Sequence, residues 1–586
     1  MENSRNFVLV LTLSLAVLIG WQWAMDYFYP QPDEVPVTAE KVDTPAEQAA
    51  VAHTRTGGLQ DPAAIAQEEA DLDTALASPN RLAIDSPRMA GSINLQGGFI
   101  DDVVLKDYAA STDGDDDQPV RIFSPRGTPA QQYSQFGFLI NGEKTSDETL
   151  WTASGGTLSP GNPVTLTHDA GNGVELQVKY SIDDQYMLTI DQSVANRGGA
   201  AIVAQPYGLV GRTSDTASED FFIAHSGPMG VFGDGANYDY DYDDIDDAKK
   251  VTPEGAASWF GFTDIYWLAA MVPQDGMAPD ATFRALGGNT YRADMIYDPV
   301  SVESGKKYTT TSRLYAGAKE SGVLDSYEDA GLEKFGLAID WGWFRWFEKP
   351  FLWLLTNIFA IVGNFGVAII ILTIIVRGLM FPIAQKQFAS MAAMKAIQPE
   401  MKKLQEKYKD DRLKQQQEMQ ALFKREKVNP LAGCLPLLLQ IPIFFALYKV
   451  LYLAIEMRHQ EFLYIKDLSA PDPATILNLF GLLPFTPPSF LAIGILAVLL
   501  GLTMWLTFKL NPSTMDPMQQ QIFNIMPWVL MFIMAPFAAG LLLYWVTSNV
   551  LTLAQQKYLY SKHPALKAAA EKEKAEKAAA AAKAGN

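Results

Sequence analysis

Apolar residues along this chain are gathered into a few long runs without charge, separated by stretches in which apolar and polar residues alternate. The uncharged runs cover residues 6–25, 350–376, 428–448, 473–508 and 517–556. Each meets or exceeds the roughly 18 apolar residues that a helix needs to cross a bilayer. The pattern therefore predicts a polytopic α-helical membrane protein and excludes a purely soluble one.

The last run, residues 517–556, is too long for one crossing. As a single helix it would measure about 60 Å, twice the hydrocarbon thickness. Pro536 and the small residues 538–540 supply a turn in its middle. A hairpin here also returns the Lys-rich tail to the cytoplasm. We therefore predict six spans with both termini cytoplasmic: residues 7–25, 357–381, 431–453, 489–508, 522–536 and 541–556.

The long region between the first two spans shows a different period. Within residues 91–335, short alternating runs such as 92–95 and 164–167 are separated by Gly, Asn and Asp turns. This pattern predicts a large antiparallel β-sandwich. Residues 27–90, rich in Pro, Ala, Glu, Asp and Gln, lack apolar periodicity and are predicted to be a flexible linker.

The remaining segments are assigned from their charge and aromatic content. Residues 1–26 end in an aromatic cluster without a small-residue cleavage site, so they are interpreted as an uncleaved anchor. Residues 336–356 mix aromatic and charged side chains, as an amphipathic helix on the outer interface does. Residues 382–430 predict a helical hairpin, residues 431–556 hold spans three to six, and residues 557–586 form a Lys/Ala-rich tail.

The distribution of charge orients these segments. The formal charge of the 586 residues is −20, and the acidic residues are concentrated in residues 26–340. Residues 386–427 and the tail have an excess of Lys and Arg. Because Lys/Arg-rich short loops remain in the cytoplasm while long domains are translocated, we expect residues 26–340 to be exported across the membrane. One Cys, Cys434, excludes an internal disulfide and a zinc site built from several thiolates.

Candidate chemistry in the exported region is weak. The acidic stretch 239–247 invites a calcium interpretation, but an EF-hand needs Gly at its sixth position and Glu at its twelfth, where this chain has Asp244 and Lys250. A solvated acidic loop is the favoured interpretation. The sequence shows no Gly-x-Ser-x-Gly elbow and no Walker motif, so we expect neither an enzyme nor a metal or cofactor.

The predicted second span contains a charged residue, Arg377, at a depth where charged side chains are rare. Arg377 closes the apolar run of the second span and would lie about 8 to 14 Å inside the hydrocarbon. The predicted spans contain no deeply placed Asp or Glu to neutralise it, whereas Gln440 and residues 547–549 offer polar partners. An interfacial, snorkelling Arg377 and an Arg377 in a wet cavity both remain open. Lys449, near the outer end of its span, is interpreted as snorkelling.

The cytoplasmic hairpin combines basic and apolar side chains. Its helices could rest on anionic lipid, or dock a polyanion such as ribosomal RNA while flexible Met side chains accept varied apolar sequences. The residues that we expect to dock are Lys402, Lys403, Lys407, Met391 and Met394.

Four motifs carry a resemblance to a known family. They are residues 373–382 (TIIVRGLMFP), 427–434 (KVNPLAGC), 440–444 (QIPIF) and 516–520 (DPMQQ). With the anchor, the exported domain and the tail, the chain resembles the YidC/oxidase-assembly/Alb family of membrane-protein insertases of Gram-negative bacteria. The resemblance implies a five-span core and an exported domain similar to a β-supersandwich.

The resemblance also implies a site and partners. It implies a hydrophilic groove open to cytoplasm and lipid, with the family's arginine at Arg377, and nascent-chain contacts that we transfer to Gln440, Ile441, Phe444 and Tyr544. The groove would also include Thr373 and Ser548. Implied partners are nascent membrane proteins, the ribosome, the Sec translocon, the lipid bilayer and the signal recognition particle with its receptor, with no role for DNA.

These observations give one leading hypothesis and two rivals. The leading one is an insertase and chaperone that works without ATP: Arg377 draws the polar flank of a nascent chain into the groove, and the apolar segment then moves into lipid. At about −0.3 to −0.6 kcal/mol per Leu-like residue, a span gains enough to offset transient burial of one or two polar groups. The first rival is a solute transporter or channel, and the second is a membrane-tethered carbohydrate enzyme or binder.

Overall fold

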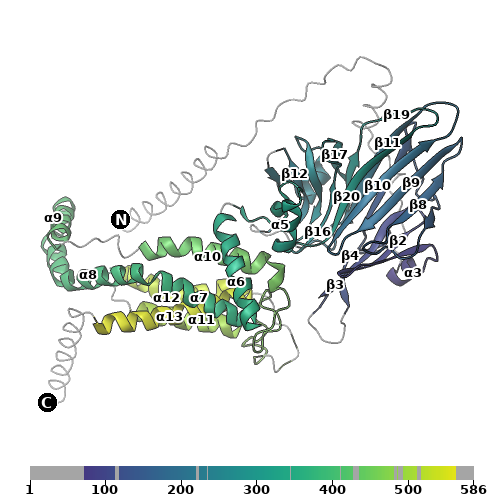
Figure 1. Ribbon diagram of the computed structural model, residues 1–586. Helices are drawn as coiled ribbons and strands as arrows, with labels where there is room; N and C mark the ends of the chain where they lie inside the picture. The colour runs from purple at the N-terminus through teal and green to yellow at the C-terminus, as the bar shows by residue number, and fades with distance from the viewer. Residues whose placement is uncertain are drawn as a thin grey trace. The chain divides into compact units, whose positions relative to one another are not determined.

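The computed structural model describes residues 71–111, 118–218, 224–233, 235–342, 345–409, 411–426, 435–480, 483, 485, 492–510 and 517–562. The expected first span, residues 7–25, and the tail beyond Lys562 lie outside the described residues. The described chain begins with a β region and continues into a helical region (Figure 1).

The β region is built from two sheets in which every paired strand is antiparallel. The first sheet has the order β1-β2-β3-β5-β11-β18-β17-β14, with β4 beside β3, β6 beside β5 and β19 beside β11. Its strands are β1 (Arg81–Asp85), β2 (Met89–Asn94), β3 (Phe99–Ala109), β4 (Pro119–Phe123), β5 (Gln132–Ile140), β6 (Glu143–Lys144), β11 (Ile202–Thr213), β14 (Lys250–Val251), β17 (Asp280–Gly287), β18 (Thr290–Ile296) and β19 (Val300–Val302).

The second sheet has the order β13-β12-β15-β16-β20-β10-β9-β8-β7. Its strands are β7 (Thr152–Ser154), β8 (Val164–Asp169), β9 (Val174–Ile182), β10 (Met187–Asn196), β12 (Gly227–Phe232), β13 (Gly235–Asn237), β15 (Ala257–Thr263), β16 (Trp267–Val272) and β20 (Lys307–Ala318). The expected antiparallel β architecture is present. It begins earlier than we predicted, because β1 and β2 lie at the end of the expected linker.

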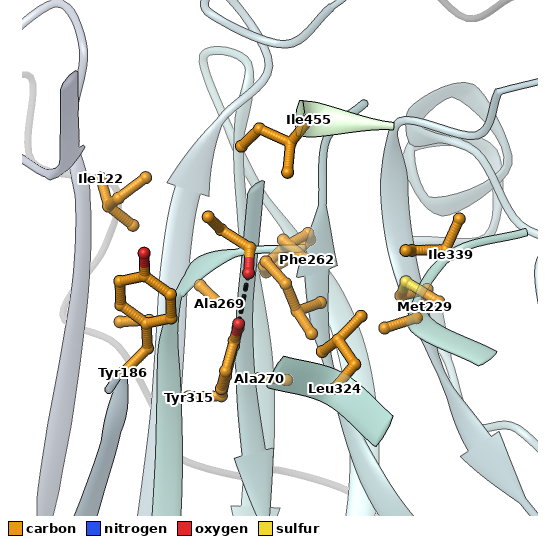
Figure 2. Close-up of a cluster of buried hydrophobic side chains, with 14 of the residues drawn as sticks. Ile122, Tyr186, Met229, Phe262, Ala269, Ala270, Tyr315, Leu324, Ile339 and Ile455 are labelled. Atoms are coloured by element: carbon orange, nitrogen blue, oxygen red, sulfur yellow. Dashed lines mark hydrogen bonds between the residues drawn. The ribbon is translucent and has the colours of Figure 1, made fainter. Parts of the chain in front are cut away.

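A continuous apolar core fills the space between the sheets. Strand β9 shows how the period-two pattern produces it, since buried residues alternate with more exposed ones along the strand. Gln192 of β10 is fully buried and donates to the carbonyls of Gly137 at 2.7 Å and Tyr207 at 2.9 Å on the opposite sheet. Tyr186, Phe262 and Tyr315 lie in the same core, and Ile455, from far along the chain, packs with them (Figure 2).

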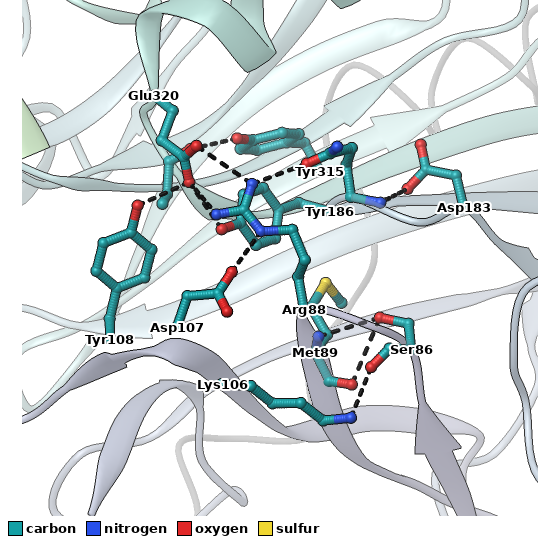
Figure 3. Close-up of polar contacts among 12 residues, drawn as sticks. Ser86, Arg88, Met89, Lys106, Asp107, Tyr108, Asp183, Tyr186, Tyr315 and Glu320 are labelled. Carbon is teal, nitrogen blue, oxygen red and sulfur yellow. Dashed lines mark hydrogen bonds and ion pairs between the residues drawn. The ribbon is translucent and has the colours of Figure 1, made fainter. Parts of the chain in front are cut away.

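A polar network fixes the chain just after β20. The guanidinium of Arg88 contacts both oxygens of Glu320, and Nε of Arg88 lies 2.5 Å from Asp107 (Figure 3). The hydroxyls of Tyr108 and Tyr186 donate to the same Glu320 oxygen at 2.7 and 2.9 Å. Because hydrogen bonds to charged groups are stronger than neutral ones, this network ties β3 and the β9–β10 turn to the segment that leads toward the helices.

Among the described residues, short helical segments accompany the sheets: α3 (Leu72–Leu76), α4 (Tyr242–Ala248), α5 (Ser321–Asp329) and the 3-10 helix η2 (Phe335–Ala338). Helix α4 corrects the expectation of an acidic loop at 239–247. Asp241 is its N-cap and accepts from the Asp244 backbone at 2.8 Å, while Asp244 accepts from the Asp241 backbone at 3.0 Å. This capping box explains the acidic residues as helix-starting signals.

The helical region comprises α6 (Arg345–Val362), α7 (Phe365–Leu379), α8 (Phe381–Lys407), α9 (Arg412–Arg425), α10 (Leu435–Leu453), η5 (Ile455–Met457), α11 (Ile495–Leu510), α12 (Pro517–Met534) and α13 (Ala539–Lys562). Helices α7, α11 and α13 lie side by side (Figure 1). By a criterion of length and mean hydropathy, none of the helices in the described ranges qualifies as a membrane span.

The helix boundaries differ from the expected ones at several places: α12 begins at Pro517 and not at residue 522, and α13 continues to Lys562, beyond residue 556. The expected helix 357–381 is divided, since α6 ends at Val362, Gly363 takes a left-handed φ of 68°, and Asn364 caps α7 by accepting from the Val367 backbone at 3.0 Å. Glycine after a helix and asparagine before one are the usual chain signals at such a break. Helix α11 begins at Ile495 and not at residue 489. The turn that we expected near Pro536 separates α12 from α13.

Candidate functional site

The central residue of the helical region is Arg377, in the last turn of α7. A cation in this position interacts favourably with the C-terminal end of the helix dipole. Helix α8 begins at Phe381, after a single intervening residue, Met380, whose backbone still donates to the Val376 carbonyl at 3.0 Å. The short connection holds Arg377 at the corner between the two helices.

Arg377 is bound by a hydroxyl and not by a carboxylate. Its Nε lies 3.0 Å from Oγ of Ser548 on α13, and its Nη2 also donates to that oxygen. Ser548 is 1% exposed, whereas Arg377 is half-buried. Within the described ranges, no Asp or Glu forms an ion pair with Arg377. The guanidinium therefore keeps its full charge beside a neutral partner.

The partner helix presents a row of polar groups at helical spacing. Tyr544, Ser548, Thr552 and Gln555 succeed one another at three- or four-residue intervals, so they share one face of α13. Tyr544 accepts from Nε2 of Gln440 on α10 at 2.8 Å, and Gln555 Nε2 lies 3.4 Å from the Arg377 carbonyl. Three helices that are distant in sequence thus bring Arg377, Gln440, Tyr544 and Ser548 together.

The other predicted site residues have different surroundings. Thr373 is fully buried, and its hydroxyl donates to the Ile369 carbonyl of its own helix at 2.6 Å. Phe444 packs against Trp545 with ring centroids 4.9 Å apart. Ile441 is 44% exposed, but Tyr544 is only 2% exposed. Of these side chains, Ile441 is therefore the one available to a partner at the surface.

The predicted hairpin is formed by α8 and α9. Ile397 and Leu422 are buried between its arms, with Met401 and Met419 packed against them. Glu400 and Arg425 join the arms by an ion pair at 2.5 Å. Lys403 and Lys407 are exposed on α8. Met391, Met394 and Lys402 also belong to α8, but their side chains are outside the described part.

Sequence reasoning missed the polar contacts where the helical region meets the β region. Lys449 does not snorkel: its side chain is 14% exposed and its ammonium lies 3.4 Å from Asp340. Glu456, in η5, has a buried Oε2 with no hydrogen-bond partner among the described residues. Burial raises the pKa of Glu456 to about 7, and the neighbouring Glu320 adds to the shift. The sequence held one signal of these contacts: Lys449 interrupts the apolar run of α10, and Glu456 follows shortly after that run ends.

Two family models match consecutive parts of the chain. Residues 81–354 match the YidC periplasmic domain, and residues 357–567 match the 60Kd inner membrane protein family. A membrane protein insertase YidC from Beijerinckia indica is 40% identical over 583 residues, covering 95% of this chain and 96% of the relative. This chain belongs to the YidC insertase family.

Other YidC proteins agree with this assignment. The insertase from Methylobacterium radiotolerans is 41% identical over 95% of this chain and 94% of its own length. Among solved structures, an active YidC insertase with its first transmembrane domain resolved covers 82% of this chain and 93% of its own, at 17% identity and a TM-score of 0.35. At this score the structural likeness adds nothing to the sequence assignment.

The assignment decides between the hypotheses drawn from the sequence. The chain is an inner-membrane insertase with a periplasmic β domain and a helical insertase region, and it is not an enzyme. It acts on nascent membrane proteins. The predicted insertase is confirmed, and the transporter and carbohydrate-enzyme alternatives are set aside.

Proposed function

We propose that Arg377 and the polar face of α13 form a hydrophilic groove, open to the cytoplasm and to lipid, that receives the polar flank of a nascent membrane protein. The observation that carries this proposal is the guanidinium of Arg377 bound to Ser548, with no carboxylate partner in the described part of the chain. A permanent cation in a membrane region needs water or an anionic partner. An acidic or polar segment of the substrate supplies that partner transiently.

The direction of transfer follows from the two environments of the substrate. Its polar flank is held by Arg377, Gln440 and Ser548, while its apolar segment leaves past exposed Ile441 and Phe445 of α10. Twenty Leu-like residues supply about −6 to −12 kcal/mol on entering lipid, at roughly −0.3 to −0.6 kcal/mol each. This exceeds the cost of holding one or two polar groups, so the cycle needs no ATP.

For this insertion process we propose the membrane topology that the sequence predicts. Six spans, counting the anchor at residues 7–25, place both termini and the α8–α9 hairpin in the cytoplasm. The hairpin exposes Lys403 and Lys407 and holds itself rigid through its own Met-lined contact. Such a basic arm suits the phosphates of ribosomal RNA. The ribosome, the Sec translocon and the signal recognition particle with its receptor are the partners that we propose on the cytoplasmic and membrane sides.

Charge reversal at Arg377 tests the groove. We expect Arg377→Glu to reduce insertion of substrates with acidic N-terminal tails by about tenfold or more, equivalent to at least about 1.4 kcal/mol, because like charges then meet. Substrates with neutral tails should be affected far less. Insertion into vesicles reconstituted with the purified protein is the measurement, and Arg377→Lys, which keeps the charge, is the matched control. Equal insertion of both substrate types by Arg377→Glu would contradict the electrostatic role.

Crosslinking tests the path of the substrate. A photoreactive residue at position 441 should crosslink strongly to a stalled ribosome-bound chain, because Ile441 is exposed on α10. The same probe at position 447 is the control, since Leu447 is on the same helix but 1% exposed. Equal yields at both positions would show that the chain does not follow this surface.

A further inference from the structure

Two buried polar side chains join α11 to α13. Thr503 of α11 and Asn549 of α13 are each 8% exposed, and Nδ2 of Asn549 donates to Oγ1 of Thr503 at 3.2 Å. The Thr503 hydroxyl donates in turn to the Leu499 carbonyl of its own helix at 2.7 Å. A hydroxyl donates one hydrogen bond and accepts through its lone pairs, so both contacts are compatible.

The neighbours of Thr503 are apolar. Leu496, Ala497 and Leu500 are buried on the same side of α11, at intervals that share one helix face. A hydroxyl or an amide in such a place costs free energy unless it is hydrogen-bonded. Thr503 and Asn549 satisfy each other, and hydrogen bonds of this kind help membrane helices to associate in one arrangement.

Asn549 directly follows Ser548, which binds Arg377. Successive residues of an α-helix are turned by about 100° around its axis. The two side chains therefore meet different helices: Ser548 contacts Arg377 of α7, and Asn549 contacts Thr503 of α11. Both α7 and α11 pack along α13. Polar contacts from two neighbours thus fix the rotation of α13 about its axis.

This rotation matters for the charge of Arg377. Oγ of Ser548 accepts from both Nε and Nη2 of the guanidinium, so it sets the direction in which the charge points. The serine side chain is short and cannot follow if α13 turns. A long arginine side chain released by its partner can bend toward the membrane interface. The position of Ser548 therefore determines how much of the time the charge stays in the site.

We infer that Asn549 is a positioning residue: by its hydrogen bond to Thr503 it fixes the rotation of α13 that holds Ser548 against Arg377, and so favours substrates with acidic tails. The inference rests on the proposed function, because it concerns the support of the same charged site. Its measure is the ratio of acidic-tailed to neutral-tailed substrate inserted. A contact that served only stability would change both substrates together and leave this ratio unaltered.

Insertion into vesicles containing equal amounts of the full-length protein tests the inference. Thr503→Val keeps the branched shape and removes the hydroxyl, whereas Thr503→Ser keeps the hydroxyl. The matched control is Thr507→Val on the same helix, since the Thr507 hydroxyl donates to the Thr503 carbonyl of its own helix at 2.8 Å. Asn549→Leu breaks the contact from the other side if Thr503→Val fails to fold. Each variant is also combined with Ser548→Ala.

We expect Thr503→Val to lower the ratio about threefold, which corresponds to about 0.6 kcal/mol. Thr503→Ser and Thr507→Val should keep the wild-type ratio, and Thr503→Val should add nothing in the Ser548→Ala background. A lower yield of both substrates at an unchanged ratio would overturn the inference. So would a further fall of the ratio in the Ser548→Ala background, because Thr503 would then act without Ser548.

Arg377→Glu separates the two possible failures. If Arg377→Glu changes the ratio and Thr503→Val does not, the charged site stands and only the positioning role is rejected. If Arg377→Glu leaves the ratio unchanged, the proposed function fails, and the positioning role fails with it.

Discussion

Arginines in the two regions of this protein have opposite environments. In the β domain, Arg212 lies 2.5 Å from Asp264 and Arg292 lies 2.5 Å from Asp294, and all four side chains are buried. In the helical region, Arg377 is bound by the hydroxyl of Ser548, and no Asp or Glu of the described residues forms an ion pair with it. In the β domain each guanidinium thus faces a carboxylate, and Asp294 is shared with Arg284, whose Nε lies 2.7 Å from it. Arg377 keeps a charge that no described carboxylate balances, and we propose that this charge receives the substrate.

The same contrast applies to an acid. Glu456 forms no ion pair with a cation of the described residues, and burial raises its pKa toward neutrality, where it can lose its charge. An arginine cannot be deprotonated in a protein. An arginine without a carboxylate partner must therefore find water or an anion, and this is why we propose Arg377, and not Glu456, as part of the functional site.

The largest expected effect comes from breaking a pair in the β domain. Asp264→Asn should lower the free energy of unfolding by about 3–5 kcal/mol, because it leaves the charge of Arg212 buried without an anion. The control is Asp275→Asn, which breaks a pair between Arg313 and Asp275, a side chain that is 81% exposed. This change should lower the free energy of unfolding by less than about 1 kcal/mol. Denaturant unfolding followed by tryptophan fluorescence measures both.

Arg377→Gln tests the stability contribution of the arginine in the helical region. It removes hydrogen bonds to one hydroxyl, so it should cost only about 1 kcal/mol in the same assay. A loss as large as that of Asp264→Asn would mean that Arg377 is a structural residue, and the comparison between the two regions would fail.

A smaller effect, dependent on pH, is expected at Glu456. Its pKa is raised to about 7 in the folded protein from an ordinary 4.5. The stabilisation from its neutral form is therefore full below pH 4.5 and is lost as pH rises through 7. Because of Glu456, we expect the free energy of unfolding of the wild-type protein to fall by at most about 3 kcal/mol between pH 5 and pH 8. This fall should be absent in Glu456→Gln. The control is Glu461→Gln on an exposed residue nearby. Parallel pH profiles for wild type and Glu456→Gln would contradict this assignment.

A further, comparably small effect, this time on insertion, comes from giving Arg377 the partner that it lacks. Ser548→Asp should convert it into a pair of the β-domain kind and reduce insertion of acidic-tailed substrates by about tenfold, or 1.4 kcal/mol, without loss of stability. Ser548→Ala keeps the charge unbalanced and should reduce insertion of these substrates less than Ser548→Asp does. Reconstituted vesicles again provide the measurement, and full activity of Ser548→Asp would show that the charge of Arg377 need not be free.

Part of the fold was readable from the sequence because its signals are local. The alternating runs of the exported region gave the antiparallel sheets, and small residues near Pro536 gave the α12–α13 turn. The break before α7 was missed, although Gly363 and Asn364 are ordinary signals for it, because the uninterrupted apolar run outweighed them. The start of the β domain was placed too late. Strand β1 is short, and it is recognisable mainly by its pairing with β2, which only the folded chain shows.

The candidate site was predictable in its residues and not in its contacts. Gln440 and Ser548 were recognised as polar groups in apolar runs, but the hydrogen bond between Gln440 and Tyr544, and the burial of Tyr544 and Thr373, depend on how α7, α10 and α13 pack. Lys449 was misassigned for the same reason. Its partner, Asp340, lies in a segment that precedes α6 and comes close only in the folded chain.

By itself, the sequence determined which segments are apolar enough for a membrane, which region is exported, and that a fixed charge interrupts the second apolar run. These are sums over neighbouring residues, so they need no knowledge of the fold. The tertiary structure decided which charges are compensated. Arg377 meets Ser548 across 171 positions of the chain, and a charge's environment is set by such distant side chains, which local sequence does not specify.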